Sequence, residues 1–78
     1  MIKDEYITKA FDKFTHCGYA DIMLLRRELR YSEYVSRGIM EMMVHKGVIS
    51  KFDGTEKQYI IIEDKKEALE ILGIKWNT

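Results

Sequence analysis

The sequence predicts a mainly α fold with a small β-hairpin: a winged helix-turn-helix with an added C-terminal helix. Three stretches carry apolar residues at helical spacing, over about 4–15, 22–30 and 33–45, with short connections between them. A β-prone region from 48 to 62 follows, with the turn pair Asp53-Gly54 inside it. We therefore expect one domain over 1–78, with its core in 4–62 and a C-terminal helix and tail in 63–78.

The first helix is expected from Asp4 to about Thr15 and ends before Gly18. Its apolar residues are spaced by one, three, one and three positions, which places them on one stripe. They are Tyr6, Ile7, Ala10, Phe11 and Phe14. Asp21 can cap a second, short helix that ends near Arg30.

Ser32 is a plausible N-cap for the third helix, which is expected from Glu33 to His45. Its core face is predicted to hold Ser36, Ile39, Met40 and Met43. The placement of Met42 and Val44 stays open, because the rotation of a helix is uncertain from sequence alone. A hairpin after Gly47 would complete the winged helix, with the loop from Asp53 to Lys57 as the wing.

Asp64 is expected to cap the last helix, with Glu67 three residues on to complete a capping box. The end of the chain is apolar, so we expect it to pack on the first helix or on a second subunit. The residues predicted to form a dimer or partner contact are Leu69, Leu72, Ile74 and Trp76.

The composition favours a globular binding domain without catalytic chemistry. Apolar residues make up 46% of the 78 residues, and the single cysteine, Cys17, excludes an internal disulfide. His16, Cys17 and His45 do not have the spacing of metal ligands, and no glycine-rich phosphate loop is present. We expect no enzyme activity, no cofactor and no metal. Without an apolar run long enough to span a membrane, a cytoplasmic protein is expected.

Charge is distributed unevenly along a chain whose formal net charge is +0. Residues 22–51 carry six basic and three acidic residues, whereas residues 1–21 and 52–78 each carry more acids than bases. The middle of the chain, which contains the predicted helix-turn-helix, is therefore the basic part.

From about Ala10 to Ile62 the chain resembles the gamma domain of the bacterial DNA translocase FtsK. The run Leu24-Leu25-Arg26-Arg27-Glu28-Leu29-Arg30 is similar to the family's Leu-Leu-Gln-Arg-Arg-Leu-Arg, and Gly47-Val48-Ile49 matches a Gly-Val-Ile. The resemblance implies a winged-helix fold that binds DNA.

The family's DNA-reading residues are not kept. Its third helix opens with Gly-Tyr-Asn-Arg-Ala, where this chain has the stretch 32–36, Ser-Glu-Tyr-Val-Ser. The family's second arginine, one turn later, corresponds to Gly38, and its Pro-Arg in the wing corresponds to Lys57-Gln58. The family's target sequence is therefore not implied.

The leading functional hypothesis is a small DNA-binding protein, most plausibly a transcriptional regulator. The third helix would enter the major groove, where Arg37 can pair with guanine, and other basic residues would contact phosphates. The candidate DNA-binding residues are Ser32, Glu33, Tyr34, Arg37, Arg26, Arg27, Arg30, Lys51 and Lys57. For Glu33 and Glu41, a plain solvent-exposed role is favoured, because carboxylates repel phosphates.

The alternative is a protein-interaction module or small inhibitor that keeps the fold without binding DNA. Beyond its core stripe the third helix carries Tyr34, Val35, Met42 and Val44, and methionine-rich apolar surfaces suit protein contacts. A homodimer is expected if DNA is the ligand, because two half-sites raise affinity. A free-standing domain of this size is also typical of phages and mobile elements.

Overall fold

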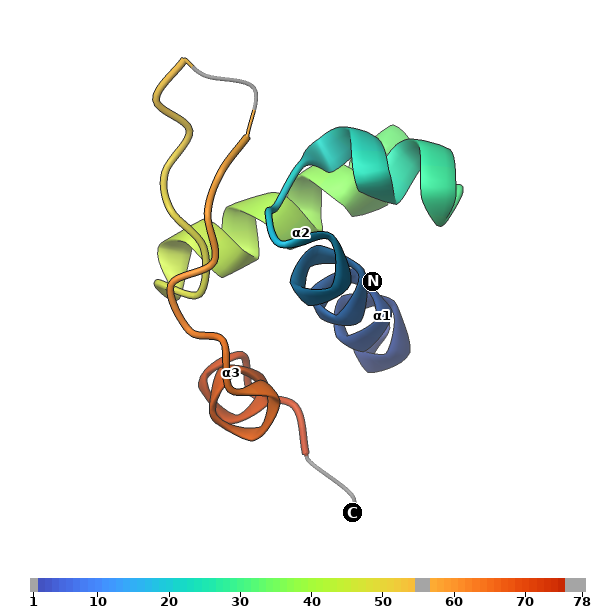
Figure 1. Cartoon of the computed structure of the whole chain (residues 1–78). Helices are drawn as coiled ribbons and strands as arrows, with labels where there is room; N and C mark the ends of the chain where they lie inside the picture. Colours follow the sequence, from blue (N-terminus) through green and yellow to red (C-terminus); the bar gives the residue numbers. More distant parts are fainter. Residues whose placement is uncertain (1, 55–56, 76–78) are drawn as a thin grey trace.

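Four helical segments follow one another in the computed structural model, which describes residues 2–54 and 57–75. They are α1 (Asp4–Cys17), η1 (Leu24–Glu28), α2 (Glu33–His45) and α3 (Lys65–Ile71). In Figure 1, α1 and α3 form the lower part of the view, and α2 crosses behind α1. Above them, η1 and a projecting loop between residues 50 and 58 lie toward opposite ends of α2.

The two long helices confirm the helical periodicity of the sequence. The buried residues of α2 are Ser36, Ile39, Met40 and Met43, the predicted stripe. Met42 and Val44, left open by the sequence, are partly buried against the core. In α1 the buried residues are Ile7, Ala10, Phe11 and Phe14. Burial of each large side chain in this set contributes about 1.5–3 kcal/mol, so this packing is the main stabilising force of the fold.

The predicted helix starts are confirmed by their capping hydrogen bonds. Ser32 Oγ accepts from the backbone N–H of Val35 at 3.1 Å, at the start of α2. Asp64 Oδ2 accepts from the N–H of Glu67 at 3.3 Å, at the start of α3. Asp21 Oδ1 accepts from the N–H of Met23 at 2.9 Å. Each carboxylate or hydroxyl satisfies a backbone donor that the helix itself leaves unpaired.

The second helix is shorter than the sequence predicts and has a π-helical segment. This segment, η1, has 5 residues, and the N–H of Leu29 donates to the carbonyl of Leu24, five residues earlier, at 3.3 Å. Arg30 then takes a left-handed conformation with φ 58°. This conformation reverses the chain sharply into Ser32 and brings α2 directly after η1.

The predicted hairpin wing is wrong, and with it the winged-helix fold class. Within residues 2–54 and 57–75 the chain forms only two isolated antiparallel bridges, Ala20–Gln58 and Ile49–Ile60, and no sheet. The turn at Gly54 is present, with φ 98°, but it lies in a long projecting loop. The fold is therefore a mainly helical one in which an extended loop replaces the hairpin.

Two polar side chains explain why the strands do not pair continuously. Gln58 Nε2 donates to the backbone carbonyl of Ser50 at 2.7 Å, and Ser50 Oγ accepts from the N–H of Tyr59 at 3.0 Å. The backbone of Gln58 meanwhile exchanges two hydrogen bonds with Ala20, at 2.7 and 2.9 Å. Side chains thus take backbone partners that a β-ladder would use.

The core extends beyond 4–62 into the C-terminal region. Leu69, Leu72 and Ile74 are buried within this chain, at 2%, 8% and 7% exposure, and Ala68 is fully buried. The C-terminal segment therefore packs on its own chain, one of the two arrangements that the sequence left open. Three of the four residues predicted for a dimer contact have little surface left to offer a second copy. The fourth, Trp76, lies outside the described residues.

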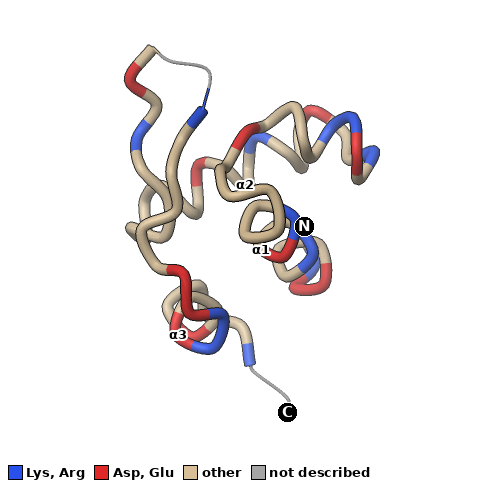
Figure 2. Tube along the Cα trace, in the orientation of Figure 1, with Lys and Arg blue, Asp and Glu red and all other residues tan. Residues whose placement is uncertain are grey.

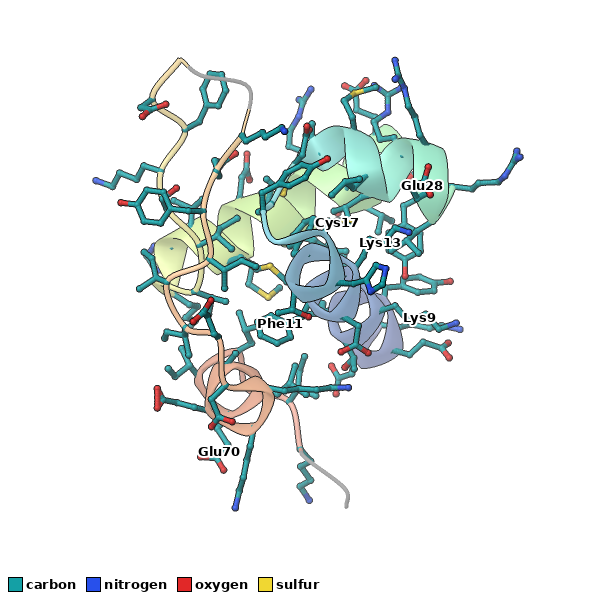
Figure 3. The ribbon with its side chains drawn as sticks, in the orientation of Figure 1. Lys9, Phe11, Lys13, Cys17, Glu28 and Glu70 are labelled. Atoms are coloured by element: carbon teal, nitrogen blue, oxygen red, sulfur yellow. The ribbon has the colours of Figure 1, made fainter. Side chains whose placement is uncertain are left out.

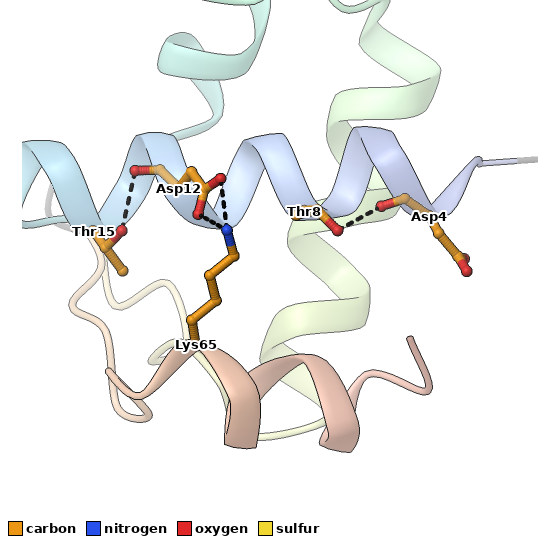
Figure 4. A network of polar contacts seen from close by, with 5 residues as sticks. All are labelled: Asp4, Thr8, Asp12, Thr15 and Lys65. Atoms are coloured by element: carbon orange, nitrogen blue, oxygen red, sulfur yellow. Dashed lines mark hydrogen bonds and ion pairs between the residues drawn. The ribbon is translucent and has the colours of Figure 1, made fainter. Parts of the chain in front are cut away.

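An ion pair ties α3 to α1 across this core. Lys65 Nζ lies 2.9 Å from Asp12 Oδ1 and 3.1 Å from Asp12 Oδ2 (Figure 4). The same view shows Thr8 and Thr15 donating their hydroxyl hydrogens to the carbonyls of Asp4 and Asp12. The side of α1 that faces α3 is therefore occupied by contacts within the molecule.

Candidate nucleic-acid interface

The outer face of α2 is the side opposite its core stripe. Tyr34, Arg37, Gly38 and Glu41 follow one another there at intervals of three, one and three residues. Tyr34 is 76% exposed, and Arg37 and Glu41 are also exposed. Apart from Gly38, which is partly covered, this face is exposed.

Arg37 is held by an acidic neighbour on the same helix. Its Nη2 lies 2.6 Å from Glu33 Oε2, one helical turn earlier. Both side chains remain more than half exposed, so the pair contributes little to stability. Its structural effect is to direct the guanidinium group of Arg37 along the outer face of α2.

Three arginines lie on η1 and on the turn between η1 and α2. Arg26, Arg27 and Arg30 are all exposed. Within the described residues, no carboxylate lies within ion-pair distance of any of them. The acidic residue of η1, Glu28, contacts Lys13 of α1 instead, at 3.3 Å (Figure 3). Among the described residues, the three arginines therefore have no ion-pair partner.

The projecting loop carries the remaining predicted cations. Lys51 and Lys57 lie on its two arms, and both are exposed (Figure 2). Lys57 Nζ lies 4.4 Å from the ring centroid of Tyr19, a cation–π contact that holds this arm against the body of the molecule. Phe52, next to Lys51, is 66% exposed. The loop thus presents basic groups and an aromatic ring together.

Two hollows lie along α2. One, of about 600 Å³, runs between the C-terminal half of α2 and the loop, and its lining residues are Met40, Glu41, Val44, His45, Lys51, Phe52 and Gln58. The other, of about 450 Å³, surrounds the N-terminal half of the outer face and is lined by Ile2, Glu33, Tyr34, Arg37, Gly38 and Glu41. Glu41 lines both hollows.

The structure brings some of the predicted residues together and separates others. Glu33, Tyr34 and Arg37 line one hollow, and Lys51 lines the other. Arg26 and Arg27 lie on η1 and Arg30 on the turn after it, and none of them lines either hollow. Ser32 is engaged as the N-cap of α2. Lys57 lies on the far arm of the loop. The predicted DNA-binding residues therefore lie on three segments: η1 with the turn after it, α2 with its N-cap, and the projecting loop.

Sequence reasoning missed Ile2, which packs on the outer face of α2. A Cβ atom placed on Gly38 would lie 2.5 Å from Ile2 Cδ1, so glycine is needed for the observed position of Ile2. The sequence signal for this contact is a glycine inside a helix. Glycine weakens a helix, so its presence indicates a position where another group approaches the backbone closely. Nothing in the sequence indicates that the approaching residue is 36 positions away.

Two other kinds of feature are absent from the described part of the chain. It contains no cluster of three or more His, Cys, Asp or Glu side chains that could hold a metal ion. No helix within it has the length and apolar character that crossing a membrane requires. Burial raises the pKa of the Tyr31 hydroxyl, and the nearby Tyr6 and Glu5 raise it further.

The sequence is similar to a known DNA translocase. It is 33% identical over 73 residues to DNA translocase FtsK of Caldanaerobacter subterraneus subsp. tengcongensis. The match covers 94% of this chain but 10% of the relative, so the chain spans about a tenth of that protein's length. No family model matches the chain, and no solved structure matches it. The expected similarity to FtsK is confirmed, while its assignment to the gamma domain stays a prediction.

Proposed function

We propose that this chain binds double-stranded DNA. The outer face of α2 would enter the major groove, with Arg37 near base edges. The arginines of η1 and the lysines of the projecting loop would contact phosphates on either side. Basic side chains at phosphates supply affinity, and side chains in the groove supply sequence preference.

The observation that carries this proposal is that three arginines, on η1 and on the turn before α2, are exposed and without an ion pair among the described residues. They are Arg26, Arg27 and Arg30. Elsewhere Lys13 and Lys65 are each paired with a carboxylate of a neighbouring helix. Because these arginines have no ion pair within residues 2–54 and 57–75, a polyanion is the partner that their charge favours.

The similarity to FtsK supports the same partner. That relative is a DNA translocase, and the matched region covers 94% of this chain, including the whole of η1 and α2 on any alignment of that length. DNA binding is thus consistent with both the surface and the comparison.

The test compares two triple variants of equal charge. Arg26→Gln, Arg27→Gln and Arg30→Asn together remove the proposed phosphate contacts. The matched control removes three exposed lysines on other segments, Lys9, Lys66 and Lys75. Binding of a fluorescein-labelled duplex is followed by fluorescence anisotropy.

We expect the arginine variant to lose about tenfold or more in affinity at low salt, because each phosphate contact contributes to the electrostatic free energy of binding. The control variant is expected to stay within about threefold of the wild type, through its change in net charge alone. Equal losses in the two variants would mean that DNA responds to total charge and not to this surface.

A second candidate function is recognition of a protein segment. It is favoured by the hollow of about 600 Å³ between α2 and the loop, to which Met40, Val44 and Phe52 contribute apolar surface. Such a hollow is typical of sites that receive an apolar side chain from a partner. Failure of the wild type to bind any duplex at low salt would favour this function over DNA binding.

A further inference from the structure

The contact between Ile2 and Gly38 places an apolar side chain in the middle of a charged helix face. Ile2 is partly buried and packs against the core, while its Cδ1 reaches the position that a Cβ of residue 38 would occupy. A glycine at this position weakens α2, since glycine is the poorest helix former after proline. A larger residue at position 38 would displace the Cδ1 end of Ile2, so the glycine keeps Ile2 at its observed position on α2.

The surroundings of Ile2 determine what this side chain can meet. It lines a hollow of about 450 Å³ together with Tyr34 and with three charged residues, Glu33, Arg37 and Glu41. Two carboxylates in this lining oppose a phosphate, so the hollow does not suit the DNA backbone. They are compatible with base edges, because cytosine presents an amino donor in the major groove.

We propose that Ile2, together with Tyr34, contacts the C5-methyl group of thymine in the major groove. This inference rests on the proposed function and specifies what the outer face of α2 recognises. Of the four bases, thymine alone presents an apolar group in that groove. Arg37, directed along the same face by Glu33, lies beside Ile2 and can pair with a neighbouring guanine. A site containing thymine next to guanine is therefore the preferred ligand.

The test replaces thymine by deoxyuridine, which removes the methyl group and keeps every hydrogen-bonding group. A preferred duplex is first selected from a random pool with the wild-type chain. Each thymine is then replaced in turn, and affinity is measured by anisotropy. Burial of one methyl group corresponds to about fourfold in affinity, so we expect a loss of about this size at one or two positions.

The variant Ile2→Ala identifies the side chain that reads the methyl. It is expected to bind thymine and deoxyuridine duplexes within about twofold of each other, because only the contact of Tyr34 with the methyl group remains. Ile61→Ala is the matched control, since Ile61 is 53% exposed and does not line this hollow. The control should keep the loss of about fourfold. Thermal unfolding followed by circular dichroism checks that both variants fold.

Three outcomes overturn the inference. Ile2→Ala could lose as much affinity on deoxyuridine replacement as the wild type, or the wild type could be insensitive to every replacement. The selected sites could also contain no thymine. In each of these cases DNA binding itself is observed, so the proposed function stands. A wild type that binds no duplex at low salt rejects both.

Discussion

Arg37 Nη2 lies 2.6 Å from Glu33 Oε2, so the central arginine of the proposed recognition face is already paired before any ligand binds. The pair uses one terminal nitrogen of a guanidinium group that has five N–H donors in a planar fork. Donors remain for a guanine, whose O6 and N7 accept two hydrogen bonds. The pair therefore orients Arg37 without using all of its hydrogen-bonding capacity.

Arg37→Ala is expected to reduce discrimination between duplex sequences, because a bidentate contact to the correct base contributes about 1–3 kcal/mol of selectivity. Lys57→Ala is expected to weaken binding to all duplexes by the same factor, because a phosphate contact does not depend on the base sequence. Affinities of both variants for a selected and a scrambled duplex separate the two roles. Equal losses from both variants on both duplexes would reject the sequence-reading role of Arg37.

Ser36→Ala is expected to stabilise the fold by about 1 kcal/mol. Ser36 is fully buried, and within the described residues its Oγ has no hydrogen-bond partner, so its hydroxyl loses water without compensation. The matched control is Ser50→Ala. Ser50 Oγ accepts a hydrogen bond from Tyr59, and its loss should destabilise by a similar amount. Urea unfolding measures both. A destabilised Ser36→Ala would show that the hydroxyl contributes a favourable contact.

Arg30→Gly is expected to leave the free energy of unfolding within about 1 kcal/mol of the wild type. The left-handed φ of 58° is strained for arginine and not for glycine, while glycine gains more entropy on unfolding. Arg30→Val should destabilise by about 1–2 kcal/mol more, because a β-branched residue resists this conformation. If Val and Gly are tolerated equally in urea unfolding, the turn between η1 and α2 does not need a left-handed residue.

Tyr31 is expected to make the fold less stable in strong base. Burial, with the nearby Tyr6 and Glu5, raises the pKa of its hydroxyl above the ordinary value of 10.0. The fold therefore favours the protonated phenol, which also donates to the carbonyl of Tyr6 at 3.3 Å. This stabilisation is fully present below the unfolded pKa and is lost as pH rises through the folded one.

The measurement is the free energy of unfolding between pH 8 and 11 for the wild type and Tyr31→Phe. The variant lacks the titrating group, so its stability should fall less over the upper part of this range. The ring contact with Tyr6, at 5.1 Å between centroids, is retained in the variant. A parallel decline in the two proteins would assign the pH dependence to other groups.

The long helices could be predicted from sequence because their signals are local. The stripe on α2 and the caps at Ser32 and Asp64 depend on residues within one or two turns of one another, and the structure confirms them. The projecting loop could not be predicted in the same way. Val48-Ile49 and the run 59–62 have high β-propensity, but the side chains of Ser50 and Gln58 take the backbone partners that a ladder requires.

The basic residues of the candidate site could be predicted from the sequence, but the tertiary contacts around them could not. Arg26, Arg27 and Arg30 are visible as a basic cluster in the sequence, and their exposure follows from their positions around the buried Leu25. The contact of Ile2 with Gly38 joins residues that are far apart in the chain, so no local pattern encodes it. The burial of Leu72 and Ile74 in the same chain likewise depends on tertiary packing, because an apolar tail suits a core and a subunit contact equally.

The most direct test of DNA binding is the salt dependence of the wild-type chain on a random-sequence duplex pool. If Arg26, Arg27, Arg30, Lys51 and Lys57 contact phosphates, the logarithm of the affinity should fall with the logarithm of salt with a slope of about −4 to −5. That slope corresponds to a loss of about 500-fold between 50 and 200 mM. An affinity that does not change with salt, or no binding at 50 mM salt, would contradict DNA binding through phosphate contacts. Either result would favour recognition of a protein segment at the hollow lined by Phe52.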